Sequence, residues 1–170
     1  MLTFEVDPAN SCAQVATLPA TGGEPTLLPL ANDDVCEAAP TFSADGTRIV
    51  YEGYNGKHRD ALFSMNRDGS DRRFVTACQG RGVTSPEASP DGKMLAFTFT
   101  CTSRAGSALF VSSANGSQLR QLTRYSMQVG FHEDWSPDSR RIVFITIPNE
   151  GTPQAQVNTS TIGADGNGLV

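Results

Sequence analysis

Three closely similar stretches recur along this chain at a nearly constant distance, and this repeat constrains the fold more than any other feature. Each stretch contains a short polar turn followed by an apolar run. The aspartates of the three turns are Asp45, Asp91 and Asp138, which are 46 and 47 residues apart. Self-similarity at a period of roughly 20 to 50 residues is typical of repeat architectures. We therefore expect an array of similar small units.

The polar turns have the residues that a tight hairpin requires. In the most complete copy, Ser89-Pro90-Asp91-Gly92, proline presets φ and glycine accepts the left-handed conformation. The same slots hold Asp45-Gly46 in the first copy and Asp138-Ser139 in the third. Serine should cost the third turn about 1 kcal/mol if its position is left-handed. The β-branched and aromatic runs that follow predict strands; these runs are Ile49-Val50-Tyr51, Leu95-Ala96-Phe97 and Ile142-Val143-Phe144.

A second turn, centred on glycine, recurs in the same register. Its glycines are Gly23, Gly69, Gly116 and Gly166, and the Asp-Gly and Asn-Gly pairs among them are strong hairpin signals. Each unit thus contains two hairpins, or four antiparallel strands, which we name a to d. A repeated four-stranded unit of this length is the signature of a β-propeller blade. A β-sandwich also has short strands, but it would not show this register.

The predicted fold is therefore an all-β, incomplete β-propeller of about three and a half to four blades, forming one domain over residues 1–170. The first unit lacks strand a, so we expect either a fragment or a piece that closes by association. Open blade faces would then favour a homodimer. The predicted blades cover residues 1–30 (partial), 38–76, 84–123 and 132–170.

The repeat also resembles a known family. The segments "SPEASPDGKMLAFTF" (Ser85–Phe99) and "SALFVSSANGSQLRQLT" (Ser107–Thr123), with Trp135 in the aromatic slot of the last copy, resemble the repeat of TolB-like propellers. The resemblance covers about four-fifths of the chain. It implies a non-catalytic protein-interaction scaffold that is periplasmic or secreted and binds an unidentified protein partner. The alternative is the gating propeller of a prolyl-oligopeptidase-like serine peptidase. A propeller lyase would need several channel histidines, and the sequence has two.

The net charge and the absence of known catalytic motifs exclude several classes of function. The net charge of −5 argues against nucleic acid as a partner. No apolar run approaches the roughly 18 residues of a membrane-spanning helix. The sequence contains no Gly-x-Ser-x-Gly elbow, His-Glu-x-x-His, Walker loop or Cys-x-x-Cys. We therefore expect no enzymatic activity, no cofactor and no metal.

The best candidate for a ligand site lies just before strand a of the last unit. His132, Glu133 and Asp134 precede Trp135 there, where blade entries ring the mouth of the channel, and Glu87 occupies the slot that matches Asp134. These side chains could form a polar or metal-binding ring, or they could only tie the loop between blades. We favour the second reading, because one histidine and scattered carboxylates make a poor ligand set. Trp135 is expected to be a core residue between blades.

The four cysteines carry information on the compartment. The register of the repeat places Cys12 with Cys36, and Cys78 with Cys101, on one face and within or nearly within one blade. A cross pair would have to span neighbouring sheets about 10 Å apart, beyond the roughly 7 Å between Cα atoms of a disulfide. We therefore predict the bonds Cys12–Cys36 and Cys78–Cys101, and with them an oxidising, extracytoplasmic location. The alternative is four buried thiols.

Overall fold

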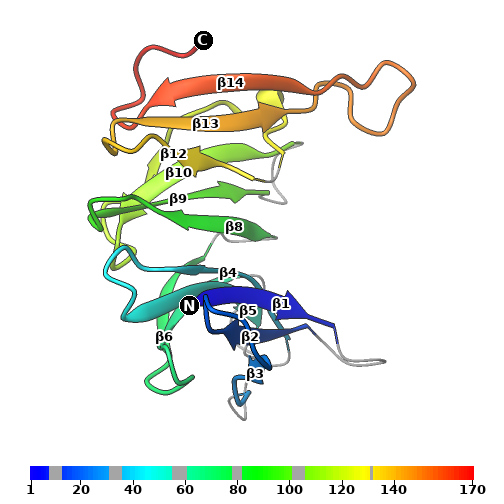
Figure 1. Ribbon diagram of the computed structural model, residues 1–170. Coiled ribbons are helices and arrows are strands. Elements are labelled where there is room, and N and C mark those ends of the chain that lie inside the picture. The colour runs from blue at the N-terminus through cyan, green and yellow to red at the C-terminus, as the bar shows by residue number, and fades with distance from the viewer. Residues whose placement is uncertain (8–12, 31–35, 55–60, 78–81, 101–105, 131) are drawn as a thin grey trace.

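The protein folds into four small antiparallel sheets, stacked one after another in chain order (Figure 1). The structure, a computed structural model, describes residues 1–7, 13–30, 36–54, 61–77, 82–100, 106–130 and 132–170. Every sheet has three or four strands, and each strand pairs with its neighbour in sequence. The prediction of an all-β, incomplete propeller is confirmed.

We number the sheets as blades 1 to 4. Blade 1 contains β1 (Leu2–Val6), β2 (Gln14–Leu18) and β3 (Thr26–Leu27). Blade 2 contains β4 (Cys36–Phe42), β5 (Arg48–Tyr54), β6 (Ala61–Asn66) and β7 (Arg73–Ala77). Blade 3 contains β8 (Val83–Ala88), β9 (Met94–Phe99), β10 (Ala108–Ser113) and β11 (Arg120–Gln121). A 3-10 turn, η1 (Tyr125–Met127), leads to blade 4, which contains β12 (Asp134–Trp135), β13 (Arg141–Thr146) and β14 (Asn158–Gly163).

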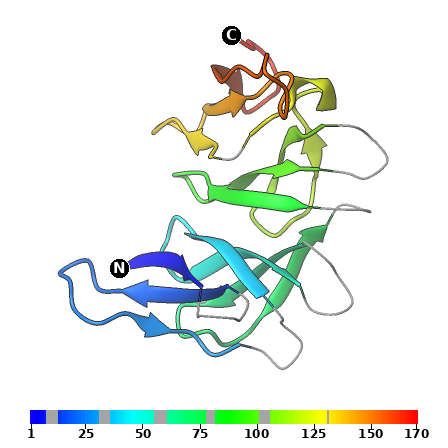
Figure 2. The same cartoon turned by 90° about the vertical axis from the view of Figure 1, so that its right-hand side faces the viewer.

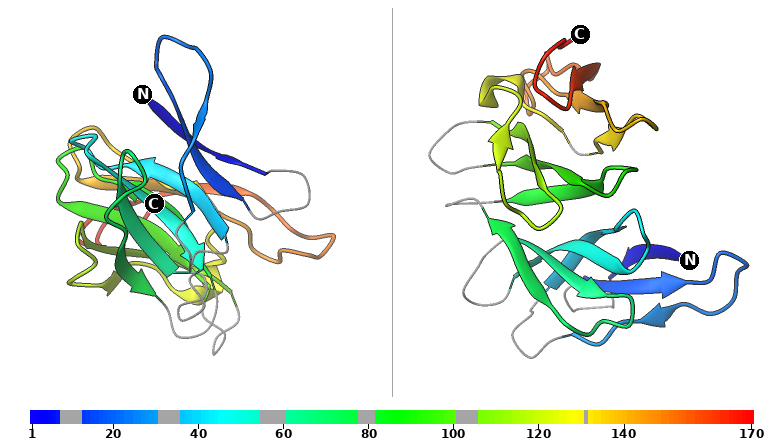
Figure 3. Two further views of the ribbon diagram at one scale, coloured as in Figure 1. Left: turned by 90° about the horizontal axis from the view of Figure 1, so that it is seen from below. Right: turned by 90° about the vertical axis from the view of Figure 1, so that its left-hand side faces the viewer.

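The first and last blades differ from the two inner ones. Figure 2 shows blades 2, 3 and 4 following one another with blade 1, in blue, beside blade 2, and Figure 3 shows blade 1 extending beyond the other blades. In blade 4, Thr161 and Val170 exchange two backbone hydrogen bonds of 2.9 Å. This is the pairing that a strand d would make, although it involves a single residue of the final segment.

The turn between strands a and b has the predicted left-handed residue in each copy. The φ angles are 65° at Gly46, 72° at Gly92 and 59° at Ser139. The turn aspartate closes each copy by accepting a serine hydroxyl, and the first such bond is 2.6 Å, from Ser43 to Asp45. This bond is the largest of the effects that lower the pKa of Asp45 to about 2. The premise that serine stands in a left-handed position in the third turn is therefore confirmed.

The turn between strands c and d brings each blade close to the one before it. Gly69, Gly116 and Gly166 have φ angles of 84°, 83° and 89°. A Cβ atom on Gly116 would collide with the carbonyl oxygen of Val75, in strand d of blade 2. A Cβ atom on Gly69 would lie 3.0 Å from Pro29, just beyond strand d of blade 1. Glycine is needed here for its conformation and for its lack of a side chain.

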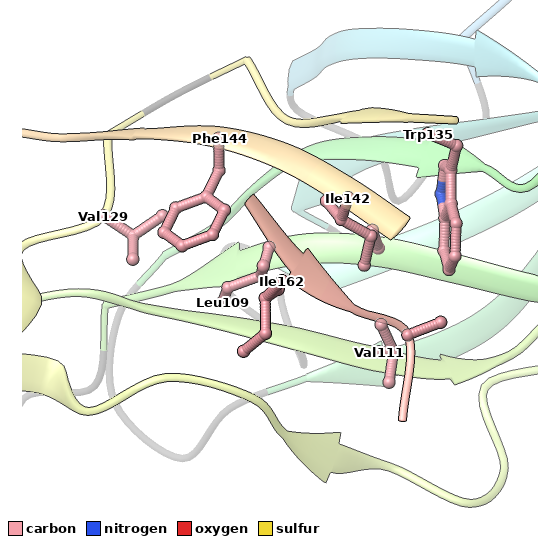
Figure 4. Packing of buried hydrophobic residues seen from close by; sticks show 9 residues of the cluster. Leu109, Val111, Val129, Trp135, Ile142, Phe144 and Ile162 are labelled. Atoms are coloured by element: carbon pink, nitrogen blue, oxygen red, sulfur yellow. The ribbon is translucent and has the colours of Figure 1, made fainter. Parts of the chain in front are cut away.

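The core consists of three apolar clusters, each between two adjacent blades. Successive residues of an inner strand b point to different clusters: Ile49 and Tyr51 pack toward blade 1, while Val50 packs toward blade 3. Figure 4 shows the cluster between blades 3 and 4. Because both faces of an inner blade are covered, its strands b and c carry continuous apolar runs instead of an alternating pattern.

Cys36 lies among the described residues and is part of a disulfide bond. The other three cysteines, Cys12, Cys78 and Cys101, lie outside the described residues. The pairing of the four therefore stays a prediction. Within the described ranges, the structure contains no helix that is long and apolar enough to cross a membrane.

Candidate functional site

The candidate site lies on the inner strands, where strand a of one blade follows strand a of the next. Strand β8 lies beside both β4 and β12. The backbone kinks at the same repeat position in blades 2, 3 and 4. Ala39, Ser85 and His132 stand there, with left-handed φ angles of 45°, 52° and 74°. The pairing of β4 with β5 and that of β8 with β9 shift register at this kink. Such a bulge redirects the side chains that follow it.

Glu133 directly follows the third kink and is buried, with only 2% of its surface exposed. The hydroxyl of Thr98 lies 3.4 Å from its Oε2 atom and donates to it. Burial raises the pKa of Glu133 to about 8, and the charge of nearby Glu87 adds to this rise, while hydrogen bonds from its own backbone and from Thr98 oppose it. At neutral pH, Glu133 is therefore mostly a neutral carboxylic acid.

Glu87, in the neighbouring blade, is half-buried. It accepts a hydrogen bond of 3.2 Å from the hydroxyl of Thr41, which occupies the same slot one blade earlier. Burial raises the pKa of Glu87, and the charge of Asp134 raises it further. Asp134 itself is exposed and accepts a hydrogen bond of 2.7 Å from the backbone N–H of Trp135. Glu87, Glu133 and Asp134 thus form one electrostatically coupled group, which we call the acidic cluster.

The remaining predicted site residue is His132. His132 is exposed and lies in the kink itself. Within the part of the chain that the structure describes, no group of three or more His, Cys, Asp or Glu side chains could hold a metal ion. Of the four predicted site residues, the structure therefore couples the three carboxylates.

The sequence analysis did not predict that Glu133 is buried, although a comparison of the repeat copies indicates it. In the two preceding copies of the repeat the same slot is filled by proline, at Pro40 and Pro86, and Pro86 is buried. Glu133 thus places an ionisable group at a repeat position that holds an apolar residue in the other two copies. Trp135 is a core residue, as predicted, with 7% of its surface exposed.

The chemistry of the acidic cluster suits a cationic group. Its carboxylates would attract an ammonium or guanidinium ion and repel anions. A bound cation would also favour the ionised forms of Glu87 and Glu133, because an opposite charge lowers the pKa of a carboxyl group. Binding would then release protons to the solvent.

Comparisons with known proteins bear on the fold. The sequence matches no protein-family model, and no curated protein matches it significantly. Solved structures do match. A structure described as TolB from Agrobacterium tumefaciens is 21% identical, with a TM-score of 0.76 over 98% of this chain. TolB from Acinetobacter baumannii is 17% identical, with a TM-score of 0.74 over 98% of this chain. A puromycin-hydrolyzing peptidase from Mycobacterium tuberculosis is 16% identical, with a TM-score of 0.64 over 99% of this chain.

These similarities define the class of fold. The chain has the fold of a TolB-like β-propeller, as its repeat predicted. It spans 58% of the length of the Agrobacterium protein and 40% of that of the Acinetobacter protein. The similarity therefore concerns the fold, and not the activities or partners of the longer proteins.

Proposed function

We propose that this chain is a non-catalytic protein-interaction scaffold of the TolB-like propeller type that works in the cell envelope or outside the cell. The observation that carries the proposal is the acidic cluster on the inner strands. It offers a protein partner the exposed carboxylate of Asp134 and the half-buried one of Glu87, next to a buried carboxylic acid, Glu133. The disulfide bond of Cys36 supports an oxidising compartment.

The partner segment that suits this cluster is rich in lysine or arginine. Two charge-assisted hydrogen bonds from such a segment would be stronger than neutral ones. Because Glu87 and Glu133 have raised pKa values, binding of a cation is coupled to loss of protons. The affinity is therefore expected to rise with pH up to about 8.

Titration calorimetry with an eight-residue lysine- and arginine-rich peptide tests the proposal. The double variant Glu87→Gln/Asp134→Asn should weaken binding at least tenfold. The matched control Glu24→Gln/Glu150→Gln removes two exposed carboxylates elsewhere and should change the affinity by less than twofold. A peptide of the same length rich in glutamate should not bind. Equal losses in the two double variants would show that the peptide senses only net charge, and would refute the role of the cluster.

A second candidate function is supported by the structural similarity to peptidases. The Mycobacterium peptidase and a puromycin hydrolase both match this chain, with TM-scores of 0.64. On this alternative, the chain is the gating propeller of a serine peptidase of the prolyl-oligopeptidase type. The coding sequence on either side of this chain decides between the two. A downstream Gly-x-Ser-x-Gly elbow in a strand–turn–helix context would favour the peptidase.

A further inference from the structure

One position of the repeat differs among the inner strands β4, β8 and β12, and this difference changes the space between blades. The residue just before the turn serine is Phe42 in blade 2, Ala88 in blade 3 and Trp135 in blade 4. Each of these side chains packs against the apolar cluster that joins its own blade to the preceding one. The slot therefore holds an aromatic side chain between blades 1 and 2 and between blades 3 and 4. Between blades 2 and 3 it holds only the methyl group of Ala88.

Trp135 shows how an indole fits this slot. Its ring lies at one end of the cluster between blades 3 and 4, close to Val111 and Ile142 and away from Val129 (Figure 4). The indole N–H donates a hydrogen bond of 3.1 Å to the backbone carbonyl of Glu87 in the preceding blade. The slot thus provides an apolar wall for the ring and a carbonyl acceptor for its polar edge.

At the interface of blades 2 and 3, where Ala88 stands in this slot, the structure has a groove of about 670 Å³. Apolar side chains from both blades line it, among them Val50, Val75, Ala88 and Leu95. Phe74, which is 49% exposed, also lines it. A groove of this volume lies within the range of about 300 to 1,000 Å³ that ligand pockets have.

A second difference keeps the groove open. Between blades 3 and 4, Arg120 crosses the interface and donates to the backbone carbonyls of Ala164 and Asp165, the second at 3.0 Å. Its counterpart one blade earlier is Arg73, which instead pairs with Asp71 of its own blade at 2.6 Å. At the earlier interface, Arg73 thus stays with its own blade and lines the groove without crossing it.

We propose that this groove binds an aromatic side chain, of tryptophan type, presented by a partner polypeptide. The ring would lie against Ala88 and Leu95, in the place that Trp135 fills with respect to its own blade. Thr41 pairs with Val50 as Glu87 pairs with Ala96, so the carbonyl of Thr41 is the counterpart of the one that accepts the Trp135 N–H. None of the three carboxylates of the acidic cluster lines the groove, although the hydroxyl of Thr41 donates to Glu87, and each site is tested by its own variants.

The volume of the groove favours a ring that is carried by a peptide chain. The groove extends from Ala88 to the turns of both blades, and its lining includes Asp45, Asp91, Arg48 and Arg73. Charges of both signs at the rim suit the alternating N–H and C=O groups of a peptide backbone. An isolated aromatic ring would offer these charged groups no backbone N–H or C=O.

Ligand-observed NMR with N-acetyl-L-tryptophanamide tests the proposal, with free indole and 1-methylindole for comparison. The wild-type chain should bind N-acetyl-L-tryptophanamide, with intermolecular contacts to the methyl groups of Val50 and Leu95. Ala88→Trp fills the groove from within and should weaken this binding at least tenfold. Ala20→Trp adds the same ring at an exposed turn outside the groove and should leave the binding unchanged.

A second variant and the comparison of the three ligands keep the proposal testable. If Ala88→Trp does not fold, Ala88→Phe, which reproduces the residue of blade 2, takes its place with the same expected loss. Weaker binding of 1-methylindole than of indole would support the hydrogen bond to Thr41. Binding of indole without binding of N-acetyl-L-tryptophanamide would overturn the polypeptide partner. The site itself would be overturned if the wild type and a folded Ala88 variant bound N-acetyl-L-tryptophanamide equally well. It would also be overturned if none of the three ligands bound.

Discussion

The buried Glu133 should make the stability of the protein depend on pH, and Glu133→Gln should remove that dependence. The ordinary pKa of the group is 4.5, and its folded value is about 8. Because the folded state holds the proton more tightly, the associated stability is fully present below pH 4.5. It is lost as the pH rises through 8, and stays constant above. Each pKa unit is worth about 1.4 kcal/mol, so the loss amounts to about 5 kcal/mol at most.

Glutamine is neutral at every pH and nearly the same shape, so the variant escapes this loss. We expect Glu133→Gln to match the wild type at pH 4.5 and to be more stable by several kcal/mol at pH 8.5. Urea denaturation at several pH values, followed by the fluorescence of Trp135, measures the difference; Trp135 is the only tryptophan of the wild-type chain. The turn aspartates do not interfere, because their pKa values are lowered, that of Asp45 to about 2.

Glu87→Gln is the matched control. The pKa of Glu87 is also raised, so its replacement should act in the same direction but less strongly, because Glu87 is only half-buried. Parallel plots of unfolding free energy against pH for the wild type and Glu133→Gln would refute the reasoning. They would show that Glu133 is ionised in the folded protein at neutral pH, with a cation or water that stabilises its charge.

Four other predictions follow from the turns, the cysteines and the open faces. Ser139→Gly relieves a left-handed residue but removes the hydroxyl that accepts the N–H of Asp91 at 3.0 Å; the two effects of about 1 kcal/mol should cancel. Ser139→Ala, which loses the bond and keeps the strain, should cost about 1 kcal/mol in thermal melts. Gly116→Ala should destabilise by more than Gly22→Ala, because both have positive φ but only the first meets a backbone carbonyl; a similar cost in urea denaturation would contradict the close approach. Non-reducing peptide mapping should recover Cys12–Cys36 and Cys78–Cys101, and a Cys36–Cys101 peptide would contradict the register argument. Sedimentation should show a dimer, since the terminal blades expose Leu2 and Val143; a folded monomer that persists on dilution would disprove it.

The fold could be read from the sequence because propeller blades are specified locally. A Ser-x-Asp turn and an Asp-Gly or Asn-Gly turn each fix one hairpin within about ten residues. Counting these turns along the chain then gives the number of hairpins, and two hairpins make one blade. The left-handed conformation at Ser139 followed from its alignment with Gly46 and Gly92, and the structure has it, with φ of 59°. No contact between distant residues was needed for this part.

The candidate site could be predicted only in part, because its properties arise between blades. The sequence placed Glu87 and Asp134 in matching slots, but the raised pKa of Glu133 depends on burial against the neighbouring blade. The cost expected for serine in the third turn likewise left out the hydrogen bond that Ser139 accepts from blade 3. Contacts across an interface depend on how two units are stacked, and a repeat aligned with itself does not contain that information.

The close approach at Gly116 has a consequence for how the molecule comes apart. Its turn rests on the backbone of Val75 in the blade before it, so blade 3 is coupled to blade 2 through contact with its immediate neighbour. A chain of units linked in this way behaves like a one-dimensional Ising array, in which stability is the sum of unit and nearest-neighbour terms. Loosening a single junction would split such an array into two cooperative halves. Amide hydrogen exchange would then show the blades on either side of Gly116 opening independently, each with its own free energy.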